Sequence, residues 1–116
     1  MAALLEAPLV LREHTEDRAV ASFAIGAEEP VFAGHYPDFP ILPGVLLLDC
    51  VHRVVRETAP GPVELSAVDS CRFTGAVYPG ETVTVTLQWK GEQVSATVHS
   101  GEQQAAKMKL TYRGVP

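Results

Sequence analysis

The sequence predicts an α+β fold in which a curved antiparallel sheet of about five to six strands wraps around one long central helix. Two observations lead to this prediction. Residues 44–58 are the one segment in which apolar side chains recur with a helical period over several turns. Segments on both sides of it read as strands, and the last three are joined by tight turns. A sheet folded over the helix is the economical way for these segments to share one core.

The predicted helix has clear ends and one apolar side. Gly44 opens the run, and the sequence Ala-Pro-Gly-Pro at 59–62 ends it. On a helical wheel the apolar residues form one wide arc, and Asp49 lies on the opposite side. The arc consists of Leu47, Leu48, Cys50, Val51, Val54 and Val55, and the polar side of Asp49, His52, Arg53 and Arg56.

The strands are expected in two groups. Two lie before the helix and are separated by a Thr-Glu-Asp turn at 15–17. After the helix, one extended segment is followed by a meander, in which Trp89 falls on the apolar face of its strand and is expected in the core. The predicted strands are residues 8–14, 18–25, 63–73, 82–90, 93–99 and 103–112.

Composition and charge limit the class of protein. With 116 residues, 47% hydrophobic and 20% charged, the chain is expected to be a single soluble domain covering 1–116. Its net charge of −5 argues against a nucleic-acid partner. No apolar run is long enough to span a membrane and the N-terminus lacks the basic start of a signal peptide, so a cytoplasmic location is expected. Cys50 and Cys71 are expected to be buried free thiols, and no Cys/His spacing indicates a metal site.

Residues 34–49 carry the most informative pattern in the chain. His35 and Asp49 stand fourteen positions apart, separated by a loop with three prolines and by the first turns of the predicted helix. Prolines fix φ and favour extended geometry in the residue before them, so this loop can hold an imidazole in one place. A base on a stiff loop beside an acid on a helix indicates paired acid–base chemistry.

The same run, Gly-His-Tyr-Pro-x-x-Pro-x-x-Pro-Gly-Val-Leu-x-x-Asp, resembles the signature of the hotdog-fold β-hydroxyacyl-(acyl carrier protein) dehydratases of fatty acid and polyketide synthesis. Cys71-Arg72-Phe73, followed by Ala-Val-Tyr-Pro-Gly-Glu at 76–81, resembles a strand and turn of the same family. The resemblance spans about residues 18–113. Because of the Phe-Pro-Ile-Leu-Pro-Gly run at 39–44 and the Asp where many members have Glu, the chain looks closest to small dehydratases of secondary pathways, such as polyene synthesis.

The resemblance implies a hotdog fold and usually a dimer, in which the loop histidine of one subunit faces the helix acid of the other. It implies that His35 takes the α-proton of a 3-hydroxyacyl thioester and that Asp49 assists loss of the β-hydroxyl as water. Gly44 matches the position whose backbone N–H polarises the thioester carbonyl, a role that suits a helix N-terminus. No metal or organic cofactor is implied, because the substrate is carried on the phosphopantetheine of an acyl carrier protein.

Further positions are candidates for substrate contact, namely Tyr36, Phe39, Val45, Arg53 and Arg72. Tyr36 and Phe39 fit better as packing residues of the loop than as specificity elements. Arg72 fits a solvated strand end as well as it fits a contact with the phosphopantetheine arm or the carrier protein. The remaining histidines lack such context and are expected at the surface or in packing; they are His14, His52 and His99.

Arg53 is the main departure from the family pattern. The dehydratases usually carry Gln four residues past the acid, whereas a guanidinium favours the ionised carboxylate and so weakens it as a general acid. An Asp49–Arg53 pair at i,i+4 is also an ordinary surface ion pair. Either Arg53 points away into solvent, or this subunit is impaired and works beside a complementary second one.

The leading hypothesis is a dehydratase that forms a trans-2-enoyl thioester, with the acyl tail along the apolar side of the helix. A hotdog thioesterase is the second hypothesis, and a non-catalytic subunit of a hetero-oligomer is the third. Carrier proteins are acidic, so docking requires a local basic patch; if its members are scattered, coenzyme A substrates become the better fit. The candidate cations are Arg53, Arg56, Arg72, Lys107 and Lys109.

Overall fold

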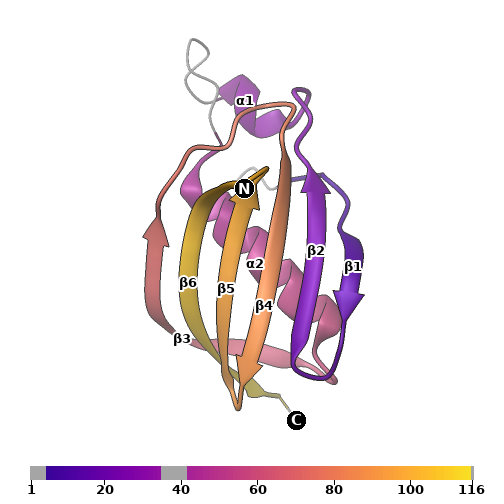
Figure 1. Ribbon diagram of the computed structural model, residues 1–116, viewed down its shortest axis with the longest axis vertical. Coiled ribbons are helices and arrows are strands. Elements are labelled where there is room, and N and C mark those ends of the chain that lie inside the picture. The colour runs from indigo at the N-terminus through magenta and orange to yellow at the C-terminus, as the bar shows by residue number, and fades with distance from the viewer. Residues whose placement is uncertain (1–4, 35–41, 116) are drawn as a thin grey trace.

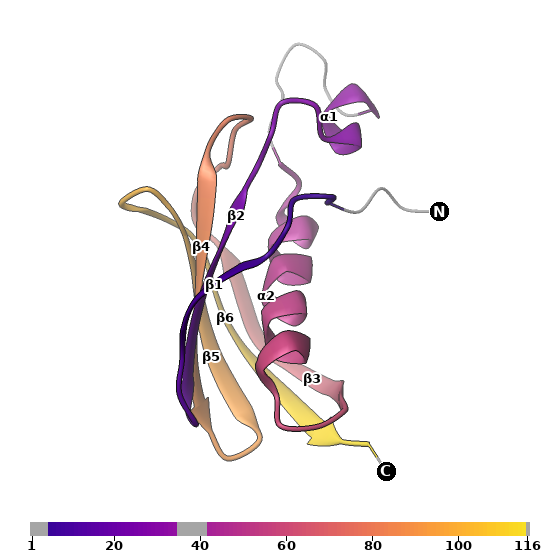
Figure 2. The same ribbon diagram turned by 90° about the vertical axis from the view of Figure 1, so that its right-hand side faces the viewer.

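The computed structural model of this chain describes residues 5–34 and 42–115, which form a six-stranded antiparallel sheet with a long helix across its concave face (Figure 1, Figure 2). The strands are β1 (Val10–His14), β2 (Arg18–Ala24), β3 (Val63–Phe73), β4 (Thr82–Lys90), β5 (Gln93–Ser100) and β6 (Gln103–Gly114), and the helices are α1 (Pro30–Gly34) and α2 (Gly44–Thr58). Across the sheet the strand order is β1-β2-β4-β5-β6-β3. No helix within the described residues is both long and apolar enough to cross a membrane.

The predicted α+β arrangement is confirmed, and α2, β3 and β4 have the predicted bounds. The meander is also confirmed, because β4, β5 and β6 are neighbours joined by turns in which Gly91 and Gly101 adopt a φ of 62°. Only the short helix α1 was missed. It begins at Pro30, a residue favoured in the first turn of a helix, but five residues are too few to show a helical period.

The core lies between α2 and the concave face of the sheet. Val51, Val54 and Val55 on the helix are fully buried, as are the alternate residues Val83 and Val85 of β4. Each such side chain contributes about 1.5–3 kcal/mol by leaving water. The apolar side of α2 is therefore occupied by the sheet. This corrects the expectation that an acyl tail runs along that side.

Strand β3 is an edge strand whose concave side stays open. Two irregularities in its pairing with β6, between Leu65 and Ala67 and between Val68 and Ser70, place apolar residues of β3 opposite residues of β6 that face the core. Leu65 is 38%, Val68 49% and Phe73 50% exposed. We name the resulting row the β3 strip; its members are Leu65, Val68, Cys71 and Phe73.

The two cysteines differ in their environment. Cys50 is buried in the core, as predicted, and burial raises the pKa of its thiol to about 12. Cys71 is exposed, contrary to the prediction. The reason is its place on the β3 strip, which extends beyond the part of the sheet that α2 covers.

A hydrogen-bonded pair ties α2 to β6. The His52 Nδ1 lies 2.9 Å from the Tyr112 hydroxyl, and the two rings stack with centroids 5.7 Å apart. Trp89 meets Tyr112 edge-on, with centroids 5.9 Å apart. Burial raises the pKa of Tyr112 to about 12, so its hydroxyl keeps its proton at neutral pH. His52 is therefore a packing residue that fixes how the helix is turned against the sheet.

This pair predicts a pH dependence of stability. Burial lowers the pKa of His52 below its ordinary 6.5, Arg56 lowers it further, and Asp49 opposes the shift. The unfolded chain therefore binds this proton more readily than the folded one, so the free energy of unfolding rises with pH up to about 6.5 and levels off above it. We expect the urea midpoint of the wild type to fall more steeply than that of His52→Gln between about pH 7.5 and about pH 5. If the urea midpoints of the two proteins fall equally with pH, His52 does not contribute to the pH dependence of stability.

Candidate functional site

Asp49 lies on the side of α2 that faces away from the sheet. Its side chain is half-buried, while Val45 one turn before it and Arg56 two turns after it are exposed. Within residues 5–34 and 42–115 the only ion pairs are Arg18–Glu13 and Arg113–Glu64. The Asp49 carboxyl thus forms no ion pair in the described part of the chain.

The N-terminus of α2 lies close to this carboxyl. Gly44 is five residues before Asp49, which corresponds to about 7.5 Å along the helix axis. The N-cap is Pro43, which offers no side-chain hydrogen bond to the first turn. The first N–H groups of a helix lack partners within the helix and carry a partial positive charge, so they suit an oxyanion.

Gly44 also has a packing role. A Cβ built at this position would lie 3.0 Å from the ring of Phe73, at the end of the β3 strip. Only glycine lets the ring approach the helix start this closely without displacement. Sequence reasoning did not single out Phe73, although it belongs to the second family-like motif at 71–81.

Arg53 turns away from Asp49 and toward β2. Its guanidinium carbon lies 4.8 Å from the centroid of the Phe23 ring, a cation–π contact. One guanidinium nitrogen is buried and has no hydrogen-bond partner among the described residues. The side chain is half-buried, so it neither pairs with the acid nor extends into solvent, the two arrangements considered for it.

Apart from Arg53, the predicted site residues divide into three groups. His35, Tyr36 and Phe39 lie outside the described residues, so their predicted roles stay predictions. Gly44, Val45 and Asp49 come together in the first turns of α2. Arg72 lies on the opposite face of the sheet from Phe73, because successive residues of a strand point to opposite sides.

The candidate cations form two separate sets. On the convex face Arg72 is directly opposite Lys107 in the β3–β6 register, and Lys109 lies two residues along β6 on the same face. The other two cations, Arg53 and Arg56, are on α2, on the concave side. We name Arg72, Lys107 and Lys109 the convex basic cluster. Its first member, Arg72, is the neighbour of Phe73 on the edge strand β3, and Phe73 lies against Gly44. The cluster therefore begins at the edge of the sheet close to the start of α2.

Comparisons with known proteins agree with the motif. A family model described as ApeI dehydratase matches residues 11–109. The 3-hydroxyacyl-[acyl-carrier-protein] dehydratase FabZ of Thermotoga petrophila is 31% identical over 93 residues, which are 77% of this chain and 68% of that protein. The FabZ of Methylobacterium sp. (strain 4-46) is 40% identical over 65 residues, or 47% of this chain, and the chain spans only 39% of that relative's length.

Solved structures confirm the fold. The dehydratase heterocomplex ApeI:P from Xenorhabdus doucetiae matches with a TM-score of 0.82 at 20% identity, over 93% of this chain and 98% of that one. The (R)-hydratase from A. caviae matches with a TM-score of 0.68 at 18% identity, over 90% and 100%. The hotdog fold is thus shared, and since the family model covers most of the chain, including Asp49 and the β3 strip, this protein belongs to the hotdog-fold acyl carrier protein dehydratase family.

Proposed function

We propose that this protein is a dehydratase that converts a 3-hydroxyacyl thioester, held on an acyl carrier protein, to a trans-2-enoyl thioester in the cytoplasm. The observation that carries the proposal is Asp49, a half-buried carboxyl without an ion pair among the described residues, about 7.5 Å along the helix axis from the N-terminus of α2. The FabZ and ApeI relatives support it at the level of the family. Fatty acid and polyketide or polyene synthesis are the pathways in which we place the reaction.

The proposed chemistry divides the two proton transfers between two groups. The His35 imidazole removes the α-proton, and the C–H electron pair moves toward the thioester carbonyl. The N–H of Gly44 stabilises the charge on that oxygen. As the pair returns to form the C=C bond, the β-carbon–oxygen bond breaks, and the Asp49 carboxyl gives its proton to the leaving hydroxide, which departs as water. Proton transfer from the imidazolium to the carboxylate then restores both groups.

The geometry of Arg53 supports activity of this subunit. A guanidinium next to the acid would favour the carboxylate, the form that cannot donate a proton. Arg53 instead lies over the Phe23 ring, on the flank of α2 that faces β2. The departure from the family's Gln therefore does not require an impaired subunit.

A second subunit completes the proposed site. Asp49 faces away from the sheet, and the β3 strip lies open beside it, so one chain does not enclose the acid. A carboxyl keeps its proton at neutral pH only when it is shielded from water. We propose that a second hotdog chain, identical or complementary, pairs along the free edge of β3 and brings its own loop histidine to Asp49. The structural neighbour from Xenorhabdus doucetiae is a dehydratase heterocomplex, ApeI:P. A complementary, non-identical subunit is therefore a specific alternative to a second copy of this chain.

The reaction itself is the first test. Incubation with a 3-hydroxyacyl carrier protein should yield the enoyl thioester by loss of one water, followed by mass spectrometry. His35→Ala and Asp49→Asn should each lower kcat by about 10²–10⁴-fold, the usual contribution of general acid–base groups. Full activity of His35→Ala would refute the assigned base. Release of free acid would indicate a thioesterase instead, and activity only after addition of a second hotdog chain would indicate a hetero-oligomer.

The free edge of β3 predicts the assembly. Val68 lies on the β3 strip and Val10 on the other edge strand, β1, and the two are similarly exposed, at 49% and 42%. Val68→Asp should dissociate the oligomer and abolish dehydration, because a buried charge opposes association and withdraws the partner's loop. Val10→Asp is the matched control and should leave the oligomeric state and the dehydration activity unchanged. Sedimentation analysis of the two variants decides between the edges; dissociation by Val10→Asp alone would place the interface at β1.

The convex basic cluster is the proposed docking surface for the acidic carrier protein. Arg72→Glu should raise KM for a carrier-bound substrate about tenfold, equivalent to about 1.4 kcal/mol, and leave KM for a pantetheine-bound substrate unchanged. Lys90→Glu makes the same charge change on an exposed residue of β4 and serves as the control. If both variants raise KM for the carrier-bound substrate equally, the net charge of the protein and not this cluster is responsible. If neither variant changes that KM, coenzyme A substrates are favoured.

A further inference from the structure

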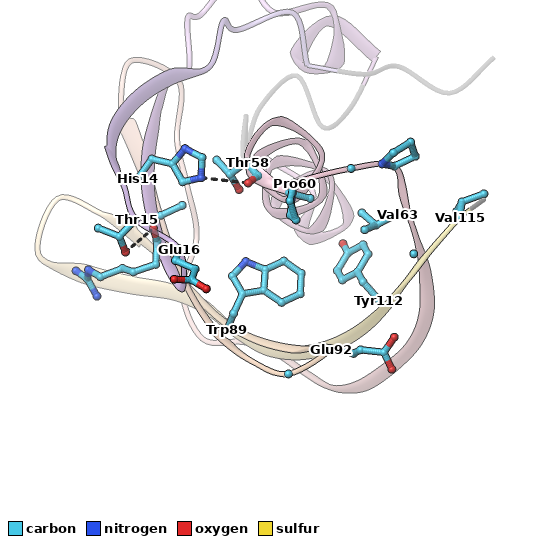
Figure 3. A pocket seen from close by; sticks show the side chains of 17 residues that line it. His14, Thr15, Glu16, Thr58, Pro60, Val63, Trp89, Glu92, Tyr112 and Val115 are labelled. Atoms are coloured by element: carbon cyan, nitrogen blue, oxygen red, sulfur yellow. Dashed lines mark hydrogen bonds between the residues drawn. The ribbon is translucent and has the colours of Figure 1, made fainter.

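The hollows beside the C-terminal half of α2 differ in charge. The larger one is lined by the end of the helix and by the β1–β2 and β4–β5 turns (Figure 3). Its cationic groups are bound within the protein, because Arg18 pairs with Glu13 at 3.0 Å and the His14 Nε2 donates to a backbone carbonyl of α2 at 3.1 Å. Glu16 and Glu92 also line it, so this hollow offers an anion no available partner.

A smaller hollow of about 300 Å³ lies on the flank of α2 that faces β1 and β2. Leu9, the residue before β1, lines one side, and Arg53, Arg56 and Glu57 of the helix line the other. The strands β1 and β3 are at opposite edges of the sheet, so the proposed second subunit on β3 leaves this hollow open. Its volume is at the lower end of the range for sites that bind small molecules. We name it the arginine hollow.

The positive charge of the arginine hollow is not compensated within the described residues. The Arg53 guanidinium carbon lies 4.8 Å from the centroid of the Phe23 ring, and its buried Nη1 has no hydrogen-bond partner in the described part of the chain. Neither Arg53 nor Arg56 takes part in the ion pairs found there. A charged group that leaves water requires an opposite charge or hydrogen bonds in exchange. An anion in the hollow would supply that exchange.

The lining also indicates which anion fits. Arg53 and Arg56 are three residues apart on the helix, so their Cβ atoms are about 5–6 Å apart and both guanidinium groups can reach one carboxylate. Glu57 is the third ionisable group, and two arginines with one glutamate give the lining a formal charge of +1. This charge matches a monoanion better than a phosphate dianion. Leu9, which is half-buried, offers an apolar wall to an alkyl group.

We propose that the arginine hollow binds a small monocarboxylate with a short alkyl body, its carboxylate between Arg53 and Arg56 and its alkyl group against Leu9. The ligand is a free acid held by charge on the flank away from the β3 strip, so the proposal does not depend on the proposed dehydratase function. The Gln that the dehydratases usually carry in place of Arg53 is uncharged and could not supply this site. The departure of this chain from the family pattern thus gains a role of its own.

The arginine side chains report on this site directly. In proton–nitrogen correlation spectra of the isotope-labelled wild type, sodium hexanoate at constant ionic strength should shift the Nε–H signals of Arg53 and Arg56 in a saturable manner. Hexanamide has the same length without the charge and should cause no saturable shift. The signal of Arg72, exposed on the convex face, should not follow the same binding curve. Equal responses to the two compounds, no saturable shift of Arg53, or the same curve for Arg72 would each overturn the proposal.

Variants of exposed helix residues supply the second test, with the hexanoate Kd as the readout. Arg56→Gln should raise that Kd at least about tenfold, the loss expected for a charge-assisted contact. Glu57→Gln removes a repelling carboxylate and should lower it about threefold. Arg72→Gln makes the same change as Arg56→Gln outside the hollow and should leave the Kd unchanged. An unchanged Kd in Arg56→Gln, or a raised one in Glu57→Gln, would refute the site. None of these measurements involves dehydration, so the proposed function stands or falls separately.

Discussion

The packing of one side of α2 against the concave sheet determines where every proposed functional group lies. Because Val51, Val54 and Val55 are fully buried against β-strands, the helix cannot rotate without exposing them, at a cost of about 1.5–3 kcal/mol for each side chain. Asp49 is on the opposite side and is therefore held away from the sheet. The flanks reinforce this orientation, since His52 is hydrogen-bonded to β6 and Arg53 rests on an aromatic ring of β2.

The same packing leaves the proposed site incomplete within one chain. The sheet is wider than the helix, so β3 extends beyond it with a free hydrogen-bonding edge and an apolar concave side. Natural proteins rarely leave such an edge uncovered, because it is a template for pairing with another strand. Leu65, Val68 and Phe73 are thus exposed beside the proposed acid, and the proposed second subunit on β3 would cover both.

The parts that sequence predicted well are those governed by local chemistry. Gly44 and the prolines after residue 59 define the ends of α2, and strict alternation in β4 assigns its core face, because these signals need no knowledge of distant residues. The same reasoning failed for β3, because its pairing with β6 is irregular. Its apolar residues are spaced by three at the two irregularities, so a period of two does not reveal that they share one face. The exposure of Cys71 and the turn of Arg53 toward Phe23 depend likewise on tertiary neighbours that no local pattern contains.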